Sequence, residues 1–327
     1  MNQTELLKKF GDDDNMISLL PSDSDFQGKK LYNYQGCWYQ YKTLRAVLHF
    51  KRNFKPLDTD IIVASYPKSG TTWLKALTVA LLERSKDGPL SHPLTSDNPY
   101  GLVQSAIGLV PFFELNLYLK SSTPDLTKLS SSPRLFSTHM PLHTLRDPLK
   151  DSPCKIVYVC RNVKDVLVSR WYFYSRIENK EAGRSILESM FESYCRGVNY
   201  YGPFWDNVLS YRRGSLEDPK HVLFMTYEDL KARPREQIMR LAEFLGCPIT
   251  QEEIHSGAVK EILELCSLHN LSNLDVNKTG KAWDNLDHNV YFRKGEVDDW
   301  KNHFTSEMEE KIDMIINEKF QGSGLKI

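Results

Sequence analysis

The stretch Tyr66-Pro67-Lys68-Ser69-Gly70-Thr71-Thr72-Trp73 joins two apolar segments of the chain, Ile61 to Tyr66 and Thr71 to Arg84. The first is short and rich in β-branched residues, which favours a buried strand, and the second has the length and pattern of a helix. A turn from a strand into a helix places backbone N–H groups and the positive end of a helix dipole together. The position of the stretch therefore predicts a phosphate-binding loop.

This loop differs from the nucleotide-triphosphate loop GxxxxGK[ST]. No glycine leads it, Lys68 comes before Gly70, and no carboxylate for a magnesium ion is evident nearby. A kinase is therefore disfavoured but stays open as an alternative. The simplest alternative is a solvated turn, which is what most short glycine-containing turns are. The Thr-Thr-Trp continuation and the apolar helix after it favour the anion site.

Three more segments read as buried strands: Arg134 to Thr138, Lys155 to Cys160 and Val222 to Tyr227. Helical patterns follow two of them, over Val163 to Tyr174 and from about Arg235 to a cap at Gly246. Further helices are expected over Leu187 to Tyr211, Gln251 to Leu265 and Ser306 to Phe320. The last of these would begin with a capping box of Ser306 and Glu309. Alternating strands and helices predict an α/β fold, a single doubly wound domain with a central parallel sheet. Ligands of such sheets bind at the carboxyl ends of the strands.

The composition is that of one ordinary globular domain. The 327 residues contain 42 Lys plus Arg and 42 Asp plus Glu, so no net field favours nucleic acid or an anionic membrane. We expect residues 1–30 to form a flexible lead-in and residues 31–327 to form the domain. The scattered cysteines and the polar N-terminus predict a cytoplasmic protein, and the longest apolar run, Ala76 to Leu82, is too short to span a membrane.

Two motifs at opposite ends of the chain carry a specific resemblance. YPKSGTTWLK at Tyr66 to Lys75 and YFRKGEVDDW at Tyr291 to Trp300 are similar to the two nucleotide-binding segments of the soluble sulfotransferases. Gly202-Pro203-Phe204-Trp205 resembles the plant-type branch, and the similarity runs from about Leu31 to the C-terminal GSGLK. The resemblance implies transfer of a sulfuryl group from 3′-phosphoadenosine 5′-phosphosulfate (PAPS) to a hydroxyl of a small organic acceptor, with no metal.

The resemblance also implies roles for particular residues. The sulfate-bearing end of PAPS is expected on Lys68, Ser69, Gly70, Thr71, Thr72 and Trp73, the 3′-phosphate on Arg161, Ser169, Arg293, Lys294 and Gly295, and the adenine edge on Tyr227. Ser169 is further expected to restrain Lys68 until an acceptor arrives. Leu268 stands where the family usually has an aromatic residue, which puts adenine stacking on that side in doubt.

His139 is the candidate general base. A neutral imidazole suits removal of a hydroxyl proton, and His139 follows a predicted strand and matches the catalytic histidine of the family. His139 and His143 also have the spacing of two zinc ligands on a helix, although Pro141 opposes a regular helix there. Ser137 stands where animal relatives carry a lysine, so Lys68 is expected to take more of the leaving-group work.

The acceptor and the oligomeric state are less determined. Aromatic residues gather at Val110 to Phe113, Trp171 to Tyr174 and Tyr200 to Trp205, where a flavonoid or steroid would stack, but core packing explains most aromatic residues. Lys301, Thr305 and Glu310 match a dimerisation motif of animal members in which Ser306 replaces a valine, so a monomer or a weak homodimer is expected. An ATP-dependent kinase and a non-catalytic nucleotide-binding protein are the other functions considered.

Overall fold

A computed structural model describes residues 13–84, 94, 106–129, 133–281 and 286–325. Its main sheet contains four parallel strands in the order β5-β4-β6-β7, with bounds Ile61–Ser65 (β4), Leu135–Thr138 (β5), Lys155–Cys160 (β6) and Val222–Thr226 (β7). The chain passes from β4 to β5 on one side and then crosses β4 to form β6 on the other. The reversal puts a topological switch point at the carboxyl end of β4, the place where open α/β sheets bind ligands.

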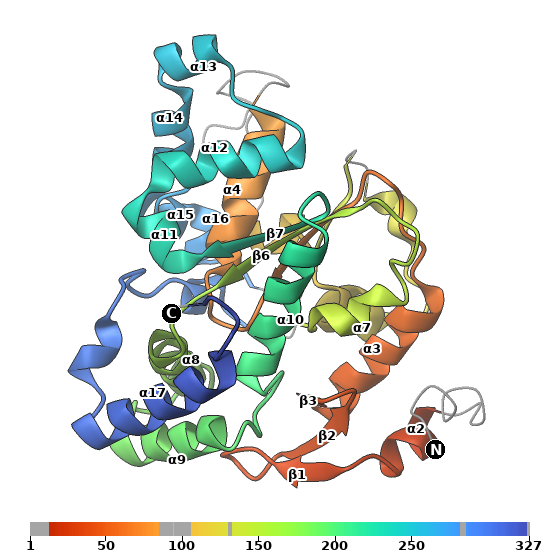
Figure 1. Ribbon diagram of the computed structural model, residues 1–327, viewed down its shortest axis with the longest axis vertical. Helices are drawn as coiled ribbons and strands as arrows, with labels where there is room; N and C mark the ends of the chain where they lie inside the picture. Colours follow the sequence, from red (N-terminus) through yellow and green to blue (C-terminus); the bar gives the residue numbers. More distant parts are fainter. Residues whose placement is uncertain (1–12, 85–93, 95–105, 130–132, 282–285, 326–327) are drawn as a thin grey trace.

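Helices cover both faces of the sheet, as a doubly wound fold requires (Figure 1). Val157 and Val159 of β6 pack in a smaller core with α4 and α12. Ile156, Tyr158 and Cys160 pack in a larger core with α3, α8 and α10, which we call the main core. Alternate side chains of a strand point to opposite faces, so a strand that is apolar throughout serves two cores at once. These helices span Tyr41–Asn53 (α3), Thr71–Glu83 (α4), Val163–Ile177 (α8), Phe204–Glu217 (α10) and Pro234–Leu245 (α12).

The remaining helices and helical turns lie before, between and after these elements. The other α-helices are Asp13–Ser18 (α2), Ala106–Leu109 (α5), Tyr118–Lys120 (α6), Leu142–Arg146 (α7), Arg184–Cys195 (α9), Tyr227–Ala232 (α11), Gln251–Ser256 (α13), Ala258–Leu265 (α14), Leu268–Asn273 (α15), Asp275–Lys278 (α16) and Ser306–Phe320 (α17). A π-helical turn spans Phe113–Leu117, and 3-10 turns span Leu126–Lys128, His288–Tyr291 and Asp299–Asn302. No helix in the described ranges has both the length and the apolar character needed to cross a membrane.

The four predicted strands and the α/β class are confirmed, but two predicted helices are wrong in extent. The expected helix over 187–211 is two helices, α9 and α10, because Gly197 and Tyr201 between them have positive φ values of 70°. The expected helix over 251–265 divides at Gly257, whose φ of 93° ends α13. At α17 the hydroxyl of Thr305, not of Ser306, accepts the capping hydrogen bond, from the backbone N–H of Met308.

The N-terminal segment has structure that the sequence did not predict. Strands Ser22–Ser24 (β1), Lys30–Tyr34 (β2) and Cys37–Tyr39 (β3) form a small antiparallel sheet, and Met16 and Ile17 of α2 are buried in the main core. Residues 13–30 of the expected flexible lead-in are therefore paired or packed against the domain, and residues 1–12 lie outside the described part. The domain boundary at residue 30 stays a prediction.

A buried ion pair closes the amino edge of the sheet. Asp60 is fully buried and accepts hydrogen bonds from two nitrogens of Arg134, at 2.8 and 2.6 Å. We predict that Asp60→Ala lowers the free energy of unfolding by about 3–5 kcal/mol, because it leaves the Arg134 charge buried without its partner. Denaturant unfolding of the purified protein measures this loss.

The control is Asp58→Ala, two residues away at an exposed position. Surface changes of this kind stay within about 0.5 kcal/mol. Equal losses in the two variants would show that the Asp60 pair does not hold the sheet edge.

Candidate functional site

A cavity of about 670 Å³ lies at the carboxyl edge of the main sheet. Ser65, Thr138, Cys160 and Thr226 end the four strands at this edge. Eleven predicted site residues line the cavity: Lys68, Gly70, Thr71, Thr72, Trp73, His139, Arg161, Ser169, Tyr227, Arg293 and Gly295. Residues more than 200 positions apart in the sequence are thus brought to one space of the size that ligands occupy.

Two predicted residues do not line the cavity. Ser69 is fully buried within the loop, and its hydroxyl has no hydrogen-bond partner among the described residues. The side chain of Lys294 is 48% exposed, and its ammonium pairs with Asp299 at 2.8 Å. Both residues are next to cavity-lining residues in the sequence, but they are not themselves part of the cavity wall.

The loop between β4 and α4 has the geometry of an anion site. Gly70 is the N-cap of α4 with φ 109°, and no side chain caps this helix end. The first N–H groups of an α-helix lack partners within the helix, so an uncapped end offers them to a ligand. The hydroxyls of Ser65 and Thr71, 2.6 Å apart, connect the strand to the helix beneath the loop.

Lys68 brings a buried positive charge to the loop. Its φ of 73° is rare for a residue with a side chain, and strained backbone of this kind gathers at functional sites. The ammonium lies 3.8 Å from the ring centre of Phe173. Burial, and then the nearby charges of Arg170, Arg293, Arg161 and Arg176, lower the pKa of Lys68 to about 7. An anion in the cavity would relieve this repulsion.

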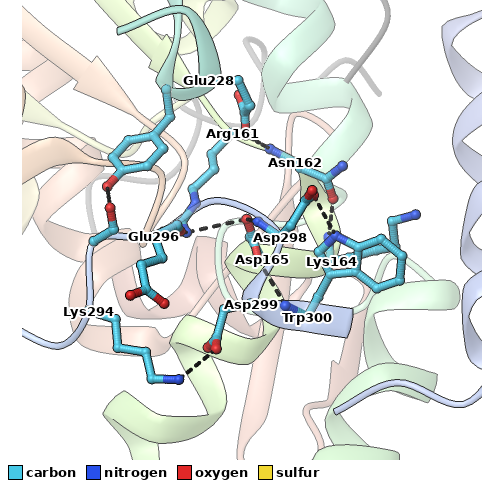
Figure 2. A network of polar contacts seen from close by, with 12 residues as sticks. Arg161, Asn162, Lys164, Asp165, Glu228, Lys294, Glu296, Asp298, Asp299 and Trp300 are labelled. Carbon is cyan, nitrogen blue, oxygen red and sulfur yellow. Dashed lines mark hydrogen bonds and ion pairs between the residues drawn. The ribbon is translucent and has the colours of Figure 1, made fainter. Parts of the chain in front are cut away.

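A second group of cations is held by carboxylates (Figure 2). Asp165 of α8 is buried, and its carboxylate lies 3.4 Å from a guanidinium nitrogen of Arg161. The same carboxylate accepts hydrogen bonds from the backbone N–H groups of Asp298 and Trp300 at 2.9 and 3.1 Å. Burial raises the pKa of Asp299, but the hydrogen bonds from Lys294 and Arg293 outweigh it and hold that pKa well below its usual range. The C-terminal motif is therefore fixed against α8 with its arginine positioned at the cavity.

Tyr227 connects the two groups of cations. Its ring centre lies 4.4 Å from the Arg161 guanidinium, and its hydroxyl donates a 2.8 Å hydrogen bond to the carbonyl of Gly295. A Cβ added at Gly70 would lie 2.8 Å from the same ring, so only glycine fits there. The side chain of Leu268 lies against Gly295, where its Cδ2 would be 3.1 Å from an added Cβ.

His139 lies on the cavity wall with its tautomer fixed by the backbone. Its Nδ1 is 2.8 Å from the carbonyl oxygen of Ser65, which only accepts, so the hydrogen is on Nδ1 and Nε2 has a free lone pair. Burial, and then the cations Lys75, Arg170 and Lys68, outweigh the hydrogen bond to Ser65 and lower the pKa of His139 to about 3. The imidazole is neutral at physiological pH and has the form of a base.

The zinc-like spacing of His139 and His143 does not form a ligand pair. Nε2 of His143 contacts the carbonyl oxygen of Gln35 at 2.9 Å, whereas His139 faces Ser65. Within the described ranges, no group of three or more His, Cys, Asp and Glu side chains is arranged to hold a metal ion.

Two buried charges near His139 were missed by the sequence analysis. Glu114 is fully buried and accepts hydrogen bonds from the His139 backbone N–H at 2.8 Å, the Thr138 hydroxyl at 3.1 Å and the Tyr201 hydroxyl at 3.2 Å. Burial raises its pKa, although these hydrogen bonds oppose the rise. Lys75, whose pKa burial lowers to about 7, donates to the carbonyl of Val110 at 2.7 Å. Glu114 stands in the largely apolar run Val110 to Leu117, and an acidic residue in such a run is the sequence signal that could have indicated a buried carboxylate.

The structure separates the aromatic residues that the sequence grouped together. Phe112, Phe173, Tyr174, Tyr200 and Tyr201 line the cavity. Their neighbours in the same runs are buried in the main core: Phe113, Trp171, Phe204 and Trp205. Cations and aromatic rings therefore share the cavity wall, where Lys68 lies over Phe173 and Arg170 near Tyr200, and His139 is among the residues that line it.

Comparison with known proteins identifies relatives of the whole chain. The family model described as the sulfotransferase domain matches residues 58–324. Cytosolic sulfotransferase 1 of Arabidopsis thaliana is 65% identical over 316 residues, which cover 95% of this chain and 93% of that protein. Cytosolic sulfotransferase 7 of the same plant is 62% identical over 332 residues and covers all of both chains.

Solved structures of the same family share the fold. A putative steroid sulphotransferase from Arabidopsis thaliana has a TM-score of 0.74 and 36% identity, and the match covers 100% of this chain and 98% of that one. The mouse sulfotransferase SULT7A1, crystallised with PAP (adenosine 3′,5′-bisphosphate), has a TM-score of 0.65 and 25% identity over 90% of this chain and 95% of that one. These matches favour the sulfuryl-transfer interpretation of the loop over the kinase alternative.

The contact between Gly70 and Tyr227 gives a prediction with a matched control. Gly257 has a similar φ of 93°, but an added Cβ there meets nothing within 4 Å. We expect Gly257→Ala to lower the free energy of unfolding by about 1–2 kcal/mol, the cost of a left-handed alanine. Gly70→Ala carries that cost and also the clash with the ring, which adds about 1–3 kcal/mol. Denaturant unfolding measures both, and equal losses would show that the ring moves away freely.

Proposed function

The chain belongs to the sulfotransferase family, and from this premise we propose that it transfers a sulfuryl group from PAPS to a hydroxyl of a small organic acceptor, with His139 as the general base. The support comes from one observation. An uncapped helix end with Lys68, a separate arginine pair and a neutral imidazole all line the same cavity. PAPS has two phosphate groups on opposite sides of its ribose, so a protein that binds it needs two separated cationic sites and a base near one of them.

The uncapped start of α4 and Lys68 would hold the 5′-phosphosulfate. Backbone N–H groups and an ammonium offer hydrogen bonds and charge where negative charge develops on the departing oxygen. Arg161 and Arg293 would hold the 3′-phosphate. Because Asp165 and Asp299 already fix these arginines, they need little rearrangement to receive it.

His139 would take the proton of the acceptor. The acceptor oxygen forms a bond to sulfur while the bond from sulfur to the phosphate oxygen breaks, and the hydroxyl proton passes to Nε2 of His139. The products are the sulfate ester, adenosine 3′,5′-bisphosphate (PAP) and a protonated imidazole, so atoms and charge balance. The hydrogen bond from Nδ1 to Ser65 keeps the tautomer that this step requires.

The aromatic rings around His139 favour an acceptor with a flat, apolar body. Phe112 packs against His139 with ring centres 4.6 Å apart, and Tyr201 packs edge-on to it at 5.3 Å. Walls of this kind suit the apolar body of a flavonoid, a steroid or another specialised metabolite. A planar acceptor that lies against these rings would hold its hydroxyl beside Nε2.

Replacement of His139 tests the role of the base. We expect the wild-type protein to transfer labelled sulfuryl groups from PAPS to a phenol, and His139→Ala to lower kcat roughly 10²- to 10⁴-fold, the usual contribution of a general base. The affinity for PAP should stay within about twofold, because the imidazole is assigned to the acceptor. Initial rates and calorimetric titration with PAP measure the two effects.

The control is His143→Ala, which removes a nearby histidine outside the cavity lining. It is expected to keep kcat. A His139→Ala protein with wild-type turnover would overturn the assignment of the base, and absence of transfer to any phenol or sterol by the wild-type protein would overturn the proposed reaction.

The lowered pKa of Lys68 predicts proton uptake when PAP binds. With a pKa of about 7, the side chain of Lys68 is mostly the neutral amine at pH 8 in the free protein. A bound phosphate raises that pKa again, because its negative charge favours the ammonium form. We expect wild-type protein to take up close to one proton per PAP at pH 8 and its affinity to fall as the pH rises from 7 to 9. Calorimetry in two buffers of different ionisation enthalpy measures the proton count.

Lys68→Met is the control for ionisation of the phosphates themselves. This variant should bind PAP more weakly and should lose most of the uptake at pH 8. Uptake that persists unchanged in Lys68→Met would assign the proton to another group.

A further inference from the structure

One face of α8 forms a wall of the cavity. Arg170, Phe173, Tyr174 and Ile177 line it, and their spacing of three, four and seven residues puts them on the same side of the helix. Phe26 from the turn between β1 and β2 packs edge-on against Tyr174 with ring centres 5.1 Å apart. Arg170 carries the one charged side chain among these four residues, and Ser169 of the same helix and Glu178 at its end also line the cavity.

Arg170 has no carboxylate partner among the residues that the structure describes. Of the other cavity arginines, Arg161 pairs with Asp165 and Arg293 with Asp299. Two carboxylates also line the cavity, but both face other groups: Glu178 lies 3.9 Å from the Lys29 ammonium, and Asp25 accepts the backbone N–H groups of Gln27 and Lys29. A guanidinium that lines a cavity without a matching negative charge is unfavourable by itself, and an anionic ligand removes this cost.

Arg170 lies against different rings from those that hold the nucleotide-site arginines. Arg161 packs on Tyr227 and Arg293 on Tyr172, whereas the Arg170 guanidinium lies 5.7 Å from the ring centre of Tyr200.

Tyr200 connects Arg170 to the base. Its ring centre is 4.3 Å from that of Tyr201, which in turn packs against His139, and its hydroxyl is 2.6 Å from that of Thr43 on α3. Arg170 is thus on the aromatic, acceptor side of the cavity and within electrostatic reach of both His139 and Lys68.

We propose that Arg170 binds an anionic group of the acceptor, so that the natural acceptor is a hydroxyl compound with an apolar body and a carboxylate or similar acid. This inference rests on the proposed function for the identity of the site. A guanidinium offers a fork of N–H donors that matches a carboxylate. The apolar stripe of α8 would receive the body, and the acid would fix which hydroxyl reaches His139.

A pair of matched ligands tests the proposal without turnover. 3-(4-Hydroxyphenyl)propanoate and its primary amide have nearly the same size and differ in charge. With PAP bound, calorimetric titration of the wild-type protein is expected to show roughly 10- to 100-fold tighter binding of the acid, the range for a charge-assisted hydrogen bond. Arg170→Met should remove this preference, and Arg170→Lys should keep part of it because the charge remains.

Arg176→Met is the matched control. Arg176 is on the same helix, but it is not among the cavity-lining residues and donates to the backbone carbonyls of Asn289 and Phe292. Its loss removes one exposed positive charge near the site and should leave the ratio of acid to amide affinity within about twofold of wild type, because water screens an exposed charge that does not contact the ligand.

Three results would overturn the proposal: equal binding of acid and amide by the wild-type protein, an unchanged preference in Arg170→Met, or a loss of PAP affinity in Arg170→Met large enough to show that this residue holds the nucleotide. Failure of the proposed function looks different. If the acid binds through Arg170 and yet no sulfuryl group is transferred to it or to any other acceptor, the reaction assignment fails while the anion site stands.

Discussion

The parallel pairing of β4 with β5 and β6 is the constraint on which the whole site depends. Ala64 pairs with Thr138 on one side and with Tyr158 on the other, so three strands end at the same level. This register puts the Lys68 loop, His139 and Arg161 at one edge, although the chain separates them by up to 93 positions. A parallel sheet reaches such an arrangement only with both faces buried, which explains why two apolar cores, and not one, support the cavity.

The positive charge gathered in the cavity is what makes the carboxyl edge of the sheet a candidate anion site. Lys68, Lys75, Arg161, Arg170 and Arg293 line one cavity, and only two of the five have a carboxylate partner among the described residues. Charges in such a space repel one another and lose hydration, which costs stability unless a ligand supplies the opposite charge. The positive φ of Lys68 adds local strain at the same place. The free protein is therefore organised for an anion before one arrives.

Local sequence together with the family resemblance indicated the parts of this candidate site that lie within one segment. The strand, turn and helix around Lys68 are contiguous, and so are Arg293 to Gly295, so their chemistry can be inferred from neighbours. The contacts of Asp165 with Asp298 and Trp300 join residues 133 and 135 positions apart, and no local pattern indicates them. The same holds for the aromatic runs: Trp171 is in the core and Phe173 in the cavity because two helical positions differ by about 200° around the axis. Arg170 directly precedes this run, and no local pattern indicates that its side chain lines the cavity.

The electrostatics of the cavity also couple its two ends. The same cations, Lys68 and Arg170, contribute to the lowered pKa values at both the loop and the base. A base with a pKa near 3 is weak, since proton transfer is most effective when the pKa of the base is close to the working pH. If a bound anion offsets part of the positive charge, the cationic contribution to the low pKa of His139 decreases, while the larger contribution from burial stays. Under the proposed function, the charge that receives the nucleotide would therefore also make the imidazole a somewhat stronger base once the sulfuryl donor is bound.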